Sequence, residues 1–170
     1  MYLAALMSLA FLVAPDAHDA PFYEAELLFP PEPFHNHSSS IVETAQGDLI
    51  ACWFHGKGER KDDTLVILGA RKNKGSDSWS APFLMADNQN LPDQNCTLFI
   101  DPEGRLWMFW ISSIDNLVRS YFLMYRVSTD FEADGPPVWS WQDPIFCRPK
   151  DADTVFPKYL DEQIERVKAA

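Results

Sequence analysis

The sequence predicts an all-β fold made of two four-stranded antiparallel repeats, each the size of one β-propeller blade, followed by a short C-terminal helix. Three observations support this. From Ser38 onward, short apolar runs alternate with turn residues. Six Trp, five Tyr and twelve Phe favour strands, and thirteen Pro favour many short connections. The same order of strands and turns then recurs along the chain.

The first repeat spans about residues 38–86. SSSIVET and LIACWFH are separated by a Gly-Asp pair, which is a strong hairpin signal. TLVILGAR follows a polar loop and is the expected third strand. WSAPFLMA is the expected fourth strand, and its proline is tolerated at the outer edge of a sheet.

The second repeat spans about residues 95–148, as comparison of the chain with itself indicates. CTLFIDPEGRLWMFW repeats the first hairpin, with Gly104 at 57 residues from Gly47 and Trp110 at 57 residues from Trp53. SYFLMYRVS and WQDPIFC then correspond to the third and fourth strands. A β-sandwich also accommodates eight such strands, but repeated motifs favour propeller blades.

A closed propeller needs at least about four blades, so we expect further blades outside the two that are recognisable. The tail, residues 151–170, has helix-favouring composition. Leu160, Ile164 and Val167 are spaced to form one apolar face of a short amphipathic helix.

Charge and cysteine content exclude some classes of protein. A formal net charge of −11 disfavours nucleic acid as a partner, because binding to phosphates needs clustered cations. Cys52, Cys96 and Cys147 are odd in number and lack CxxC spacing, so they predict neither a zinc site nor a disulfide framework. The apolar run around Cys52 indicates a buried side chain.

The first residues predict export. Residues 3–14 form an uncharged apolar run that is long enough for a signal-peptide core and too short to cross a membrane. We therefore expect residues 1–20 to be a signal peptide and the protein to be secreted or periplasmic, with no membrane span.

Five stretches carry a resemblance to the bacterial BNR-repeat (Asp-box) proteins classed as sialidase-like: HNHSSSIVETAQGDLIACWF, GERKDD, TLVILGARKNKG, WSAPF and LFIDPEGRLWMFW. The resemblance covers roughly residues 27–148, which is most of the chain, and the predicted propeller domain spans residues 27–150. It implies a six-bladed propeller, of which this chain supplies the first blades, and an exo-acting glycoside hydrolase with a glycan or acidic sugar as substrate. The Asp-box turns are degraded, with Asn73 at the Asp position of the first.

The resemblance also implies where the chemistry would lie. Sialidases hold the substrate carboxylate with three arginines, and use an aspartate as acid/base and a tyrosine activated by a glutamate as nucleophile. The region of the first arginine is PFHNHSSSIVE here, which offers His35 and His37 instead. His37 can bind an anion when protonated or act as a base when neutral.

The loop HGKGERKDD corresponds to the connection that carries the second arginine and the acid/base in sialidases. Arg60 resembles that arginine, and Asp62 or Asp63 resembles the acid/base. Neighbouring carboxylates such as Glu59 raise the pKa of a carboxyl group that must donate a proton. A solvated charged loop is the structural alternative.

Further candidates surround these residues. His35 and His37 lie two apart, so an extended backbone points both to one face. Spacing identifies no third ligand, so we expect no metal and no cofactor. Asp93 and Asn95, where the second repeat begins, are weaker candidates for substrate binding because innermost strands of a propeller face its channel.

Two other functions stay open. A polysaccharide lyase would use His37 or a tyrosine to remove a proton beside a uronate carboxyl group. A non-catalytic carbohydrate-binding propeller is favoured by the missing first arginine.

Overall fold

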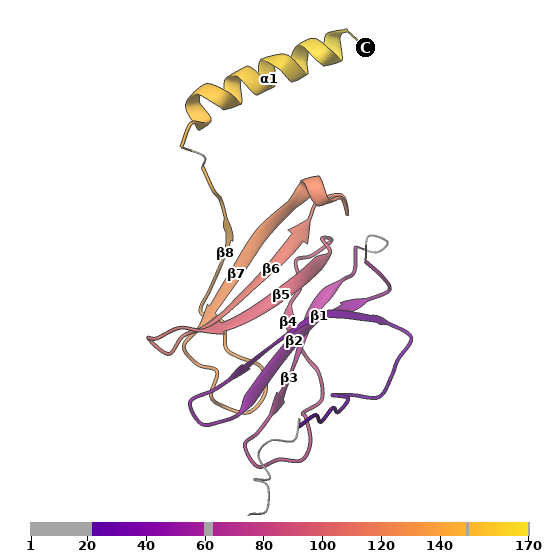
Figure 1. The fold of residues 1–170 in the computed structure, drawn as a ribbon, viewed down its shortest axis with the longest axis vertical. Coiled ribbons are helices and arrows are strands. Elements are labelled where there is room, and N and C mark those ends of the chain that lie inside the picture. Colours follow the sequence, from indigo (N-terminus) through magenta and orange to yellow (C-terminus); the bar gives the residue numbers. More distant parts are fainter. Residues whose placement is uncertain (1–21, 60–62, 149, 170) are drawn as a thin grey trace, which may run out of the picture.

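The computed structural model describes residues 22–59, 63–148 and 150–169, and these form two four-stranded antiparallel sheets and one helix (Figure 1). The predicted fold class is confirmed. Blade one contains β1 (His35–Glu43), β2 (Leu49–Gly56), β3 (Val66–Lys72) and β4 (Phe83–Ala86). Blade two contains β5 (Asp93–Ile100), β6 (Leu106–Ser113), β7 (Tyr121–Ser128) and β8 (Trp141–Ile145), followed by the helix α1 (Ala152–Lys168).

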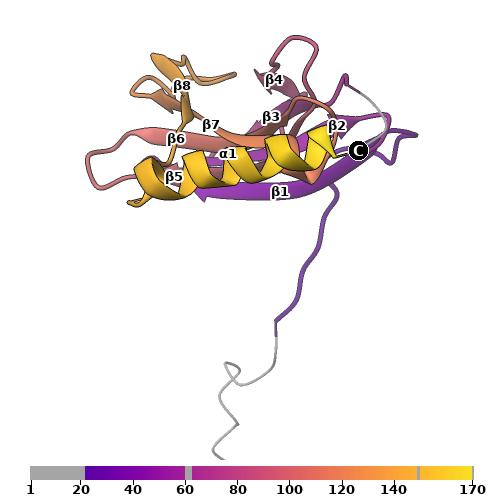
Figure 2. The same cartoon turned by 90° about the horizontal axis from the view of Figure 1, so that it is seen from above.

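Each sheet is a meander in which strands follow one another in chain order, and no strand of one sheet joins the other. Seen from above, β1 and β5 lie side by side, whereas β4 and β8 lie at the opposite side of the molecule (Figure 2). A sandwich would exchange strands between its sheets through Greek-key connections. The observed order is instead that of two successive blades with their first strands together.

The two hairpins that carry the sequence repeat fold in the same way. Gly47 and Gly104 have φ angles of +88° and +76°, a region where a side chain is disfavoured. The amide of Gly47 donates to the Thr44 carbonyl at 3.0 Å, and that of Gly104 donates to the Asp101 carbonyl at 2.9 Å. Residues that are 57 positions apart in these two hairpins therefore adopt the same backbone conformation.

The repeat also extends to a bulge in the first strand of each blade. The register of β1 shifts between His37 and Ser40, and that of β5 shifts at the equivalent place. Ser38 and Asn95 stand there with φ angles of +53° and +51°, which are costly for residues with a side chain. The Ser38 hydroxyl donates to Asn95 Oδ1 at 3.0 Å, so each bulge supports the other across the boundary between blades.

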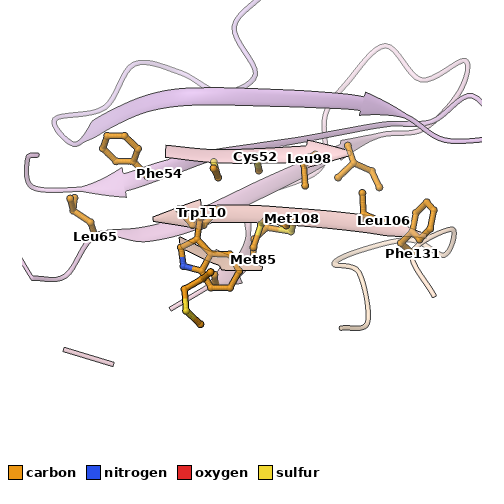
Figure 3. Packing of buried hydrophobic residues seen from close by; sticks show 14 residues of the cluster. Cys52, Phe54, Leu65, Met85, Leu98, Leu106, Met108, Trp110 and Phe131 are labelled. Atoms are coloured by element: carbon orange, nitrogen blue, oxygen red, sulfur yellow. The ribbon is translucent and has the colours of Figure 1, made fainter. Parts of the chain in front are cut away.

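The hydrophobic core lies between the two blades and is shared by them (Figure 3). Blade one contributes one face of β2 and β3 with its neighbouring strands, and blade two contributes the opposing face of β5 and β6. The buried members are Ile50, Cys52, Phe54, Leu65, Ile67, Met85, Ala86, Cys96, Leu98, Leu106, Met108, Trp110, Met124 and Phe131.

Two arginines link the blades from the buried side. Arg71 of β3 is only 2% exposed and donates to the carbonyl of Phe131 beyond β7. Arg126 of β7 donates to the Met85 carbonyl in β4, and its guanidinium lies 5.4 Å from the centre of the Trp110 ring. Hydrogen bonds from a charged donor to a buried carbonyl are among the stronger polar links between elements.

The outer face of blade two differs from the equivalent face of blade one. At the offset of 57, the fully buried Ile50 and Phe54 correspond to Trp107 and Ile111, which are only half-buried. Trp107 stacks against Phe109 with ring centres 6.1 Å apart. The Tyr125 ring of β7 lies 5.8 Å from the Trp107 ring and 6.5 Å from the Phe109 ring, so this face carries a half-buried aromatic cluster.

Some boundaries differ from the sequence prediction. β1 begins at His35 rather than at Ser38, β5 begins at Asp93 rather than at about residue 95, and the fourth strand of blade one begins at Phe83 rather than at Trp79. The Trp79 indole donates to Glu26 at 3.2 Å. The helix lies within the predicted tail, residues 151–170. It stands apart from both sheets (Figure 1), and none of its described residues is buried. No helix in the described ranges is long and apolar enough to span a membrane.

Asp93, at the first position of β5, is completely buried. Its carboxylate accepts hydrogen bonds from the Trp110 indole at 2.8 Å, from the Asn88 amide at 2.6 Å and from the hydroxyl of Ser112. Burial raises the pKa of Asp93, against these hydrogen bonds, which act to lower it. Asp93 therefore links Asn88, in the connection after β4, to Trp110 and Ser112 of β6 through hydrogen bonds.

We predict that Asp93→Asn changes the pH dependence of stability. Because the pKa is raised on folding, ionisation of Asp93 costs stability. That cost is absent below its ordinary pKa of about 4 and appears as pH rises through the folded value. The free energy of unfolding of the native protein, relative to Asp93→Asn, should thus be highest near pH 4 and decline towards neutrality in denaturant titrations.

The exposed Asp77 provides the control, because Asp77→Asn should change stability by less than about 0.5 kcal/mol. A stability difference between native protein and Asp93→Asn that grows in favour of the native protein with rising pH would contradict the assignment.

Candidate functional site

The first residues of β1 bring two histidines together. The rings of His35 and His37 have centres 5.6 Å apart, so they share one face, as their spacing predicted. Both rings pack near Phe54, at 5.3 and 5.5 Å. His37 is exposed, whereas Nε2 of His35 is buried with no hydrogen-bond partner among the described residues. His37 is therefore accessible to a ligand, and the His35 ring packs beside it on the buried side.

The loop after β2 lies at the same end of the sheets as these histidines, because β1 begins where β2 ends. Arg60 and Asp62 fall outside the described residues. Glu59 is half-buried and Asp63 is exposed. The side-chain amide of Asn116 in blade two donates to Asp63 Oδ1. Asn116 lies in the connection after β6, so equivalent connections of the two blades meet here.

The remaining two predicted residues are in different surroundings. Asn95 is exposed, and its side chain accepts the hydroxyl of Ser38, which directly follows His37. The structure thus brings Asn95 to the histidine pair. Asp93 is buried and accepts four hydrogen bonds from three residues, so its geometry favours a structural role over substrate contact.

A cavity of about 540 Å³ borders His37 on blade one. It lies between the segment before β1 and the outer face of β1 and β2, and its volume is in the range of small-molecule sites. Phe29 and Trp53 form an aromatic wall with ring centres 5.1 Å apart. The lining residues are Glu26, Leu27, Leu28, Phe29, Pro31, Glu32, Phe34, Asn36, His37, Ser38, Ser39 and Trp53.

Polar groups are fixed at the edge of this cavity. Asn36 Nδ2 donates to Glu32 Oε1 at 2.9 Å, and Nδ1 of His55 lies 2.9 Å from Asn36 Oδ1 and 3.3 Å from Glu32 Oε1. Trp53 is 4% exposed, and its indole N–H is buried without a partner among the described residues. The half-buried Phe29 ring, backed by the buried Trp53, lies beside oriented carboxylate, amide and imidazole groups, and such a set can stack on and hydrogen-bond to a sugar ring.

Sequence reasoning missed several of these residues. Glu32 and Phe29 precede the first repeat, where no periodic pattern marks them. Asn36 was visible only as the residue between the two histidines, and strand alternation places it on the opposite face, beside His55. Asn116 lies in a turn and has a φ of +60°. Asparagine is enriched at positive φ, and its residue type is the signal in the sequence that could have pointed to this turn.

No group of three or more His, Cys, Asp or Glu side chains within the described ranges is arranged to hold a metal ion. The described side chains around the candidate site can supply hydrogen bonding, ring stacking and proton transfer through His37, Glu32 or Asp63.

Comparison with known proteins gives a family for the chain. Residues 47–152 match the model of the BNR repeat-like domain, which is more than half of the chain. Among curated proteins, none matches the chain.

Two solved structures share the fold. The Hadza microbial sialidase Hz136 superposes with a TM-score of 0.50 at 15% identity, covering 65% of this chain and 26% of the sialidase. A protein of unknown function from Dyadobacter fermentans DSM 18053 superposes with a TM-score of 0.53 at 18% identity, covering 71% of this chain and 38% of that protein. The chain therefore belongs to the BNR repeat-like family, and its two sheets form part of a sialidase-type β-propeller.

Proposed function

We propose that this chain supplies the first two blades of a glycan-active, sialidase-like propeller that removes a terminal sugar by hydrolysis. The single observation that carries the proposal is the cavity bordered by His37, which combines the Phe29 ring, packed on Trp53, with the hydrogen-bonded Glu32 and Asn36. Sugar rings present apolar C–H faces and polar edges, which such a wall and rim can contact together. One structural neighbour is itself named a sialidase.

Proton transfer is assigned to two groups in this proposal. Asp63 is the general acid, because it is exposed at the same end of the sheets and is held through Asn116. His37 contacts the substrate as an anion-binding or basic group. Arg60, Asp62 and Glu59 belong to the same loop as Asp63 and are the further charged groups of the proposed site. Asn95 and His35 keep His37 in position.

The remaining parts of the site are expected from further blades. The half-buried aromatic face around Trp107 and Phe109 has the composition of a blade interface, and the proposal is that a further blade covers it. We also propose that the protein is exported, because residues 1–20 contain an apolar run typical of a signal peptide. These residues lie outside the described ranges.

Carbohydrate binding without catalysis is the second candidate. The described residues that line the cavity include glutamate, asparagine, serine and histidine, and no arginine or lysine. A sugar carboxylate would therefore find no permanent cation on this wall, which favours recognition of a neutral sugar.

Substitution of the two proton-transfer residues tests the enzymatic proposal in the whole protein that carries this chain. We predict that His37→Ala and Asp63→Asn each lower kcat/KM by at least about 100-fold, the usual contribution of general acid–base groups. Both side chains are exposed, so the melting temperature should stay unchanged. Asp63→Asn retains the oxygen that accepts from Asn116. Normal turnover by both variants would refute the assignment, and Asp77→Asn serves as the matched surface control.

Product analysis separates hydrolysis from elimination. Incubation with sialosides, neutral oligosaccharides and uronate-containing polysaccharides should release a saturated terminal sugar, which chromatography with mass detection identifies. A polysaccharide lyase would instead leave an unsaturated uronate with near-ultraviolet absorbance. Binding without any product would favour the second candidate.

A further inference from the structure

Two cysteines from different blades occupy the shared core. Cys52 of β2 is 0% exposed and Cys96 of β5 is 4% exposed, and both belong to the core cluster between the sheets, in which Figure 3 labels Cys52. At the offset of 57 residues, Cys52 corresponds to Phe109 and Cys96 to Ser39. The pair is therefore not a product of the repeat, but a feature of this one interface.

Both thiols lie beside the bulge of β1. Cys96 Sγ donates to the Ser38 carbonyl at 3.5 Å, on one side of the register shift. Cys52 is paired with Ser40 on the other side, and its thiol interacts with the Ser40 backbone and with the Cys96 thiol. The amide of Leu98 donates to Ser40 Oγ at 3.0 Å, which holds β5 against the bulge.

We propose that Cys52 and Cys96 form a disulfide that links blade one to blade two when the chain folds in the presence of a disulfide oxidant. The two thiols give up two protons and two electrons, and one S–S bond forms between them. The oxidant is a low-molecular-weight or protein disulfide, whose own S–S bond breaks as it takes up both protons and electrons to become two thiols.

The reduced pair is inert once the blades have closed. Interaction with Cys96 and burial together raise the pKa of the Cys52 thiol, and thiol–disulfide exchange requires a thiolate. Oxidation therefore takes place before the interface closes, while both thiols are still accessible. The bond, once made, is protected from reductants by the same burial.

The expected consequence is a covalent loop across the interface. The bond would close the 43 residues 53–95, which include most of blade one and the connection between the blades. Cross-linking a segment of this length restricts the unfolded chain and stabilises the folded one. Cys147 is exposed and is not a member of the core cluster, so the proposed bond does not include it.

The test counts thiols in the full chain after refolding with oxidised glutathione. After free thiols are blocked, denaturation in a mass-tagged maleimide should leave Cys52 and Cys96 unlabelled until a reductant is added, and peptide mapping should find them in one linked pair. In Cys147→Ser, the oxidised form should melt at least about 5 °C above the reduced form. Cys52→Ser is the matched control, in which oxidation should produce no such shift.

Labelling of Cys52 and Cys96 in the first, native blocking step would show that they are not buried and would overturn the proposal. Full recovery of both thiols after denaturation without reductant, or pairing of either with Cys147, would also overturn it. None of these outcomes depends on the glycan activity, so failure here leaves the proposed function standing.

Discussion

The shared core between the two blades is the constraint on which the rest of the structure depends. Each blade is a four-stranded sheet whose apolar face must be covered, and here the face around Phe54 packs against the face around Trp110. Arg71 and Arg126 strengthen that contact from opposite blades by donating to buried carbonyls. Because the core is common to both sheets, loss of packing on one side exposes the other.

The same interface positions the candidate site. β1 and β5 lie together at the boundary, and the paired bulges at Ser38 and Asn95 turn the backbone just beyond His37. The hydrogen bond between them offsets part of the cost of these two left-handed backbone conformations. The position of the exposed His37 is thus fixed by the same contact that joins the blades.

The fold was predictable because its signals are local. Gly47 and Gly104 mark turns that require positive φ, and the apolar alternation around them fixes the hairpins. Other features depend on tertiary contacts. An aspartate at the start of a strand suggests an exposed position, but the donors that bury Asp93 come from Trp110, Ser112 and Asn88. The aromatic wall of the cavity needs Phe29 to reach Trp53 from a segment without periodicity. The same-face placement of His35 and His37 followed from strand geometry alone.

Hydrogen exchange followed by mass spectrometry tests most directly whether the two blades are one cooperative unit. Peptides from β2 and from β6 should lose protection together, with the same opening free energy and the same dependence on denaturant, because their side chains share one core. Protection of β6 that persists under conditions where β2 has fully exchanged would contradict this account, since blade two would then be stable without blade one.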